Sequence, residues 1–383
     1  MKNLSTLHGI AAALILACSI GAAQADELVI GQVAPITGVI ADTGKDLVLG
    51  AQIYFDSVNE QGGVNGRKIT HLVKDDGYKV PETVQGMKDM VANDNVIALI
   101  GSAGSAHLSA VLKEKILADA GIALVAPYTG SLALREPFAD TRNIFHIRAG
   151  YVDEAEKIVD QLMALRTDKI AVFHQGDAFG NAGLDGVVAA LQRRGKSIVV
   201  SASYVANSPP DAGVDEAVKK IAAADPSAVI MWSTSPYSAA FVRKIRPLAR
   251  IAQFVNVSVG TQEAISKAAG PEASRGIGIA QVMPFPYSSA FHVVTEYLAA
   301  LKKYGHGAKP SYTSLEEYIG AKVLVEGVRR AGPNPTREKV YKALEGMSSY
   351  DTGGFVVHFS PTSHTGSSFV EITVISANGK LIR

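Results

Sequence analysis

Residues 96–106, VIALIGSAGSA, carry a pattern that recurs along most of the chain. Residues 96–100 are a short apolar run, which indicates a strand that is buried on both faces. The loop of glycine and serine that follows leads into a helical run over residues 105–120. A strand, a loop and a helix in this order form the repeating unit of a parallel sheet that is covered by helices.

The same alternation of short apolar runs and helical runs fills two consecutive parts of the chain. The expected strands lie at residues 28–33, 68–74, 96–100, 123–126, 144–148, 169–174, 197–204, 228–232, 253–257 and 278–282. The sequence therefore predicts an α/β protein with two doubly wound parallel-sheet lobes. Near the end, residues 355–359 and 369–375 alternate apolar and polar side chains, which predicts a terminal β-hairpin.

The N-terminus has the features of an export signal. Lys2 precedes an apolar run over residues 10–20, and Ala23 and Ala25 form an A-x-A cleavage site. The run is shorter than the roughly 20 residues of a spanning helix. Because the only cysteine is Cys18, cleavage after Ala25 leaves no thiol for disulfides, nucleophiles or metal ligands. A lipid-anchored form on Cys18 stays open as an alternative.

Composition and missing motifs exclude several functions. The chain has 37 basic and 36 acidic residues, so a basic surface for nucleic acid is not expected. Motifs for nucleotide phosphates, for a hydrolase nucleophile and for zinc are missing, so we expect no enzyme activity, no cofactor and no metal. The acidic pairs Asp75-Asp76 and Glu316-Glu317 are interpreted as solvated surface, because adjacent side chains diverge.

Hydroxyl groups follow two neighbouring strands of the first lobe. Ser105 closes the loop after residues 96–100, and Thr129, Gly130 and Ser131 follow the next strand. Ligands bind at the carboxyl ends of parallel strands, and free N–H groups at a helix start favour an anion such as a carboxylate. The structural alternative for Ser105 is an ordinary helix cap.

Several segments are similar to one known family: LVIGQVAPITG at residues 28–38, VNEQGGVNG at 58–66, LIG at 99–101, IAVFH at 170–174 and the helical run at 316–331. From end to end, the chain resembles the type I periplasmic binding proteins of the leucine/isoleucine/valine-binding family. The resemblance implies crossover strands near residues 145–149, 278–283 and 350–354. Lobe 1 would comprise residues 26–148 and 278–350, and lobe 2 would comprise residues 149–277 and 351–383.

The resemblance also implies the function of a monomeric, periplasmic substrate-binding subunit of an ABC importer, which closes on a small molecule and delivers it to an inner-membrane permease. A sensory subunit for a receptor remains an alternative. In the family, Ser105 and Thr129, Gly130 or Ser131 would bind the ligand carboxylate, and Asp153 would bind its ammonium. The structural alternative for Asp153 is a helix cap.

The chain departs from the family pattern at three positions that would shape the ligand. Phe179 and Thr234 stand where the leucine-binding proteins carry tyrosines, and Ser258 stands where they carry a glutamate for the ammonium. Tyr128, Tyr151 and Tyr237 are further candidates for the pocket wall. An amino acid, an aromatic or other organic acid and an amide therefore all remain open as the ligand.

The export signal gives a first testable prediction. N-terminal sequencing of protein recovered from the periplasm should begin at Asp26, because Ala23 and Ala25 satisfy the cleavage site. A mature protein that begins at a lipid-modified Cys18 would contradict this and would place the protein on a membrane tether.

Overall fold

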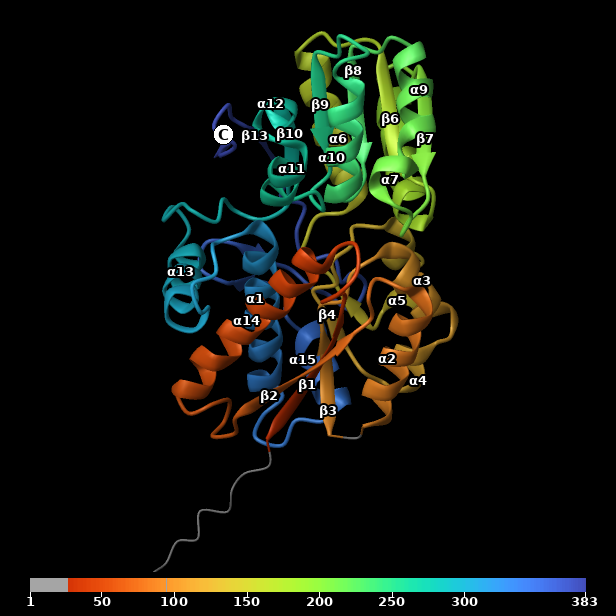
Figure 1. The fold of residues 1–383 in the computed structure, drawn as a ribbon. Coiled ribbons are helices and arrows are strands. Elements are labelled where there is room, and N and C mark those ends of the chain that lie inside the picture. Colours follow the sequence, from red (N-terminus) through yellow and green to blue (C-terminus); the bar gives the residue numbers. More distant parts are fainter. Residues whose placement is uncertain (1–26, 94) are drawn as a thin grey trace, which may run out of the picture.

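The computed structural model describes residues 27–93 and 95–383, so the predicted export signal at residues 1–25 lies outside the described residues. Figure 1 shows two lobes stacked on each other, each with helices around a central sheet. One sheet has five strands in the order β2-β1-β3-β4-β5, and the other has seven in the order β14-β13-β10-β9-β8-β6-β7. Both sheets are mainly parallel, which confirms the predicted fold class.

Lobe 1 is built from the first third of the chain and from helices that come late in the sequence. Its strands are β1 (Leu28–Ala34), β2 (Ile69–Asp75), β3 (Val96–Ile100), β4 (Leu124–Val125) and β5 (Ile144–Phe145). Its helices are α1 (Ala41–Glu60), α2 (Val80–Ala92), α3 (Ser105–Lys113), α4 (Ile116–Asp119), η1 (Leu132–Leu134), α5 (Phe138–Thr141), α13 (His292–Tyr304), α14 (Tyr312–Arg330) and α15 (Arg337–Glu345). The expected single helix at 105–120 is divided, because Lys115 adopts a left-handed conformation with φ 55°.

Lobe 2 is built from the middle of the chain and from its last strands. Its strands are β6 (Ile170–Gln175), β7 (Val200–Tyr204), β8 (Ala228–Trp232), β9 (Gln253–Asn256), β10 (Ile277–Gln281), β13 (Glu371–Ile375) and β14 (Leu381–Ile382). Its helices are α6 (Tyr151–Ala164), α7 (Ala178–Gln192), α8 (Pro210–Gly213), α9 (Asp215–Ala223), α10 (Ser235–Ile245), α11 (Gln262–Ala269) and α12 (Pro271–Ser274). Among the described helices, none is both long and apolar enough to span a bilayer.

The chain passes between the lobes three times, but two of the passages lie later than expected. The first follows β5. The second begins after Gln281, because β10 is paired with β9 and β13 in the sheet of lobe 2. The third was expected at residues 350–354, yet Phe355 and Phe359 are buried in the core of lobe 1, so the chain leaves that lobe only after them. Burial of these aromatic rings fixes the segment to lobe 1.

The predicted terminal hairpin between residues 355–359 and 369–375 is wrong. Within the first segment, β12 (Val356–Val357) pairs with β11 (Tyr350–Asp351) in a small separate sheet. The second segment forms β13, which pairs with β10 and with β14. The alternation of apolar and polar residues identified strands correctly, but such a pattern carries no information about which strand is the partner.

The packing of α7 against β8 gives a prediction about stability. A Cβ atom on Gly183 of α7 would lie 2.0 Å from the ring of Trp232, at the end of β8. Gly183→Ala should therefore lower the free energy of unfolding by about 1–3 kcal/mol, as overpacking of a core usually does. The measurement is urea unfolding followed by circular dichroism.

Gly278→Ala is the matched control for this experiment. Its Cβ would meet its nearest neighbour, on Val255, at 3.5 Å, which is an ordinary contact, so stability should change little. Equal unfolding midpoints for the two variants would show that α7 does not pack on Trp232 as described.

Candidate ligand-binding cleft

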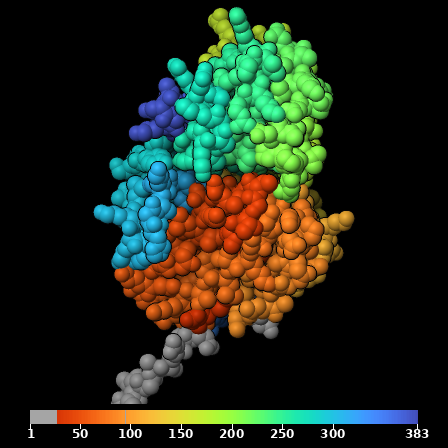
Figure 2. Space-filling view, in the orientation of Figure 1, coloured from red at the N-terminus to blue at the C-terminus, as the bar shows by residue number. Residues whose placement is uncertain are grey.

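A narrow cavity lies between the lobes, where the loops after the strands face each other. Its lining comprises Ile40, Thr43, Tyr78, Ala103, Gly104 and Tyr128 of lobe 1 and Tyr151, Phe179, Thr234 and Val259 of lobe 2. Its volume is only about 20 Å³, and Figure 2 shows the two lobes in contact on the displayed face. The lobes therefore have to separate before a molecule larger than water can enter.

A pair of buried hydroxyl groups lies on the lobe 1 side of the cleft. Ser105 Oγ and Thr129 Oγ1 are 2.8 Å apart, and both residues are fully buried. Thr129 Oγ1 also accepts a hydrogen bond from the Ser131 N–H at 3.2 Å. Ser105 is the first residue of α3, and the cap position belongs to Gly104, so the hydroxyl of Ser105 is not a helix cap. The N–H groups of the first turn of α3 remain free to meet an anion.

Aromatic side chains of lobe 2 lie next to this hydroxyl pair. The ring of Tyr151 lies 5.7 Å from that of Phe179 and packs edge-on against Trp232 at 5.4 Å. Burial raises the pKa of Tyr151, although hydrogen bonding to Thr129 and Ser105 opposes this rise. The hydroxyl of Tyr151 therefore stays protonated and can donate a hydrogen bond beside the pair.

A buried charge cluster lies beside the aromatic wall. The Arg148 guanidinium is 3.8 Å from Glu154 of α6 and 3.6 Å from Glu316 of α14, and it lies 4.7 Å from the ring centre of Tyr128. It also donates a hydrogen bond to Ser258 Oγ. Arg148 belongs to the first crossover, and its side chain connects this crossover with Glu154 of lobe 2 and Glu316 of lobe 1.

The carboxylate of Glu154 already has hydrogen-bond donors within the protein. Glu154 accepts hydrogen bonds from the Ser258 N–H at 2.9 Å and from its hydroxyl at 3.0 Å. Burial raises the pKa of Glu154, and the nearby Arg148 opposes this rise. Burial likewise raises the pKa of Glu316 to about 7. Near neutral pH, Glu316 therefore carries its proton part of the time, which limits the excess of negative charge.

Asp153 does not line the interlobe cavity, and neither do Ser105 and Thr129, so its role at the ligand stays a prediction. Its Oδ2 accepts a hydrogen bond from the Gly150 N–H at 2.9 Å, in a capping box at the start of α6. Successive residues of a helix point about 100° apart. The buried acid that faces the lobe interface is consequently the next residue, Glu154.

Most of the other predicted site residues are gathered at the cleft. Tyr128, Tyr151, Phe179 and Thr234 line the cavity itself. Gly130 lies behind it, where a Cβ would come within 2.5 Å of the ring of Tyr151.

Two predicted wall positions have other contacts. Tyr237 turns away from the cavity, since its hydroxyl donates to Ser208 O at 2.7 Å and its ring stacks on Tyr204. Ser258 contacts the cluster around Arg148 and does not line the cavity.

The sequence interpretation missed the acids that matter most here. Glu316 and Glu317 are buried on α14, and Asp76 is buried and accepts hydrogen bonds from Thr83 and Tyr78, so their assignment to solvated surface is wrong. The apolar residues that flank Glu316 and Glu317 in the sequence were the available signal, because a helix that is apolar on all sides is buried. Arg148 had no local signal.

Comparisons with known proteins agree with this architecture. Residues 27–380 match the model of a family described as periplasmic binding protein. A substrate-binding periplasmic protein from Ralstonia solanacearum has a solved structure that is similar with a TM-score of 0.87 and 37% identity, covering 93% of this chain and 99% of that one.

Two further relatives carry names that mention amino acids. An amino acid binding protein of Pseudomonas aeruginosa is 25% identical over 85% of this chain and 83% of its own length. The structure of a branched-chain amino acid ABC transporter protein from Thermus thermophilus with bound valine has a TM-score of 0.82 at 18% identity, covering 93% and 95% of the two chains. At that identity the likeness concerns the fold. The family is one of binding proteins and not of enzymes, and the match over nearly the whole described chain shows that this protein belongs to the periplasmic binding protein family.

Proposed function

We propose that this binding protein is the substrate-binding subunit of an ABC importer and that its ligand is a small carboxylic acid. The observation that carries the proposal is the buried hydroxyl pair of Ser105 and Thr129. The pair lies at the N-terminus of α3, where free N–H groups and the helix dipole favour a negative charge. The Tyr151 hydroxyl is hydrogen-bonded to the same pair, so three hydroxyl groups gather at this point.

The charge balance of the cleft favours an acid without an ammonium group. A buried ammonium needs a carboxylate partner, because an unpaired buried charge is costly. Among the described residues, no acid lines the cavity. The buried acid Glu154 on the lobe 2 side has both oxygens occupied by Ser258 and lies near Arg148.

The aromatic walls favour an apolar body for this acid. Tyr78, Tyr128, Tyr151 and Phe179 line the cavity from both lobes, and flat apolar ligands pack well against such rings. We therefore infer an aromatic or similarly apolar carboxylic acid. An amino acid is the second candidate, and the name of the Pseudomonas aeruginosa relative supports it.

Hinge closure is the proposed mechanism of capture. Hydrogen bonds at the cleft join the lobes directly: Asn207 Nδ2 donates to the Tyr78 carbonyl at 3.1 Å, and the Tyr128 hydroxyl donates to the Ser258 carbonyl at 3.4 Å. These bonds break when the lobes separate, so ligand contacts would shift the equilibrium toward the closed form. The proposed partner that binds the closed form is an inner-membrane ABC permease.

The hydroxyl pair gives the prediction that tests the carboxylate site. Ser105→Ala and Thr129→Val should each weaken binding of the acid by about 1.5–3 kcal/mol, the usual value of a hydrogen bond to a charged group. A thermal-shift screen identifies the acid, and isothermal titration calorimetry measures its affinity. Ser274→Ala, which removes a buried hydroxyl on α12, is the control and should leave the affinity unchanged. Loss of stability without loss of affinity in the first two variants would refute the site.

A second prediction concerns the ammonium. In matched pairs such as phenylalanine with phenylpropanoate and leucine with isocaproate, the des-amino acid should bind the cleft at least about tenfold more tightly, a difference of about 1.4 kcal/mol, when cleft binding is measured as the binding that Ser105→Ala removes. The reason is that the cleft offers no free carboxylate to the ammonium. Tighter binding of the amino acids, together with a large loss of affinity in Glu154→Gln, would establish an amino-acid importer instead.

A further inference from the structure

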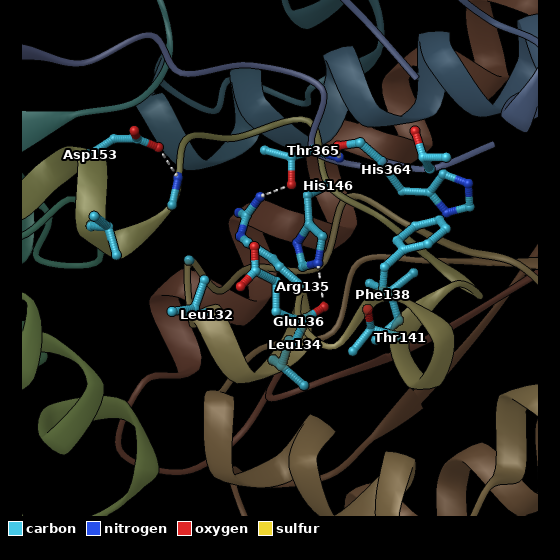
Figure 3. A pocket seen from close by; sticks show the side chains of 16 residues that line it. Leu132, Leu134, Arg135, Glu136, Phe138, Thr141, His146, Asp153, His364 and Thr365 are labelled. Carbon is cyan, nitrogen blue, oxygen red and sulfur yellow. Dashed lines mark hydrogen bonds between the residues drawn. The ribbon is translucent and has the colours of Figure 1, made fainter. Parts of the chain in front are cut away.

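A second cavity lies behind the first crossover, apart from the cleft (Figure 3). Lobe 1 contributes residues 130–146, and the start of α6 in lobe 2 contributes Val152 and Asp153. The loop of residues 362–365 in the third passage completes the lining. The cavity holds about 390 Å³, which lies within the range of roughly 300–1,000 Å³ typical of small-molecule sites.

Arg135 forms one wall of this cavity and is only 8% exposed. Its Nη2 donates to the carbonyls of Arg148 and Ala149 at 3.1 and 3.3 Å, and its Nη1 donates to Thr365 Oγ1 at 3.1 Å. Its Nε has no hydrogen-bond partner among the described residues. No carboxylate of the described residues lies within 4.0 Å of this guanidinium. Burial and the neighbouring Arg148 lower the pKa of Arg135 to about 10, and the charge of Asp153, which is not in contact, opposes this only in part. An anion directly beside the guanidinium would offset the cost of its burial.

Asp153 lies on the opposite side of a small gap. At Gly150, a Cβ atom would be 3.6 Å from Arg135 Nε and 3.4 Å from Asp153 Oδ2. The two charged groups are therefore more than 4.0 Å and at most about 7 Å apart, too far for an ion pair with each other. The ammonium and carboxylate of a free amino acid are separated by two bonds through one carbon, so one such molecule can reach both groups with ordinary hydrogen bonds.

The remainder of the lining is largely apolar. Leu134, Phe138 and Ile144 face the cavity. Leu132 and Val152 also line it and are 48% and 40% exposed, which is unusual for such side chains. An apolar side chain of a ligand would cover them.

We propose that this cavity is a second binding site, for a neutral α-amino acid whose carboxylate binds Arg135 and whose ammonium binds Asp153. A purely structural role for Arg135 as a tie between the crossovers explains the contacts of its two Nη atoms. It does not explain the unpaired Nε. The proposed site does not depend on the identity of the cleft ligand.

The position of the site connects its occupancy with the hinge. Its walls come from both lobes and from two of the three passages between them, so its geometry changes when the lobes separate. A ligand that favours one hinge angle changes the affinity of the cleft, and the cleft ligand changes the affinity of this site by the same factor.

The test uses L-leucine, its des-amino analogue isocaproate and its decarboxylated analogue isoamylamine as probes, with saturation-transfer NMR and calorimetry as readouts. The comparison is made in the double variant Ser105→Ala/Thr129→Val, in which the cleft is disabled. There L-leucine should bind, and each analogue should bind at least about tenfold more weakly, because each loses one charged contact. Gly150→Ala places a methyl group in the gap at ordinary contact distances, so the protein should fold and leucine affinity should fall by about tenfold or more. Gly278→Ala is again the glycine control.

Asp153→Asn separates the charge of this residue from its structural role. The amide oxygen can still accept from the Gly150 N–H, but the negative charge is lost. This variant should lose the preference for leucine over isocaproate.

The double variant Ser105→Ala/Thr129→Val distinguishes the cavity from the cleft. Leucine binding should survive in it. If leucine binding is lost there and retained in Gly150→Ala, the amino acid occupies the cleft and the proposal is overturned, as it is if no leucine binds to the unmodified protein.

Discussion

The hinge and the cleft both depend on the burial of one positive charge, that of Arg148. Its guanidinium lies between Glu316 of lobe 1 and Glu154 of lobe 2, and it holds Ser258 and the ring of Tyr128 as well. Loss of this cation would leave two buried acids without a neutralising charge, and breaking a buried pair typically costs about 3–5 kcal/mol. The first crossover therefore cannot move without rearranging the polar contacts beside the ligand cavity.

Local sequence patterns were sufficient for most strands and helices, because burial on both faces of a parallel sheet leaves apolar runs such as residues 96–100 and 228–232. Those two runs form β3 and β8 with the expected bounds. The pairing of the C-terminal strands could not be predicted in the same way. The run at residues 369–375 finds its partner in β10, which lies about 90 residues earlier in the chain. The spacing of apolar and polar residues within either strand does not indicate such a distant pairing.

Local sequence patterns also predicted some residues of the candidate site and missed others. Ser105 and Thr129 could be selected because each follows a recognisable strand, and parallel strands bring their ends together. Whether Asp153 or Glu154 faces the lobe interface depends on the angle at which α6 meets the crossover. Moving by one residue along a helix turns the side chain by about 100°. Glu316 was misassigned because α14 is covered on nearly all sides by α1, α13, α15 and strands of lobe 1.

The three passages between the lobes also determine when the protein can fold. The helix α1 packs against α14, about 250 residues later, and β10 needs β13 from the last fifteen residues of the chain. Lobe 1 is not complete until residues 355–359 are present and lobe 2 not until β13 is present, and contacts between such distant segments form slowly. In a chain that is threaded through a membrane from its N-terminus, lobe 1 can close its core only after residues 355–359 have emerged, and lobe 2 only after β13 has emerged.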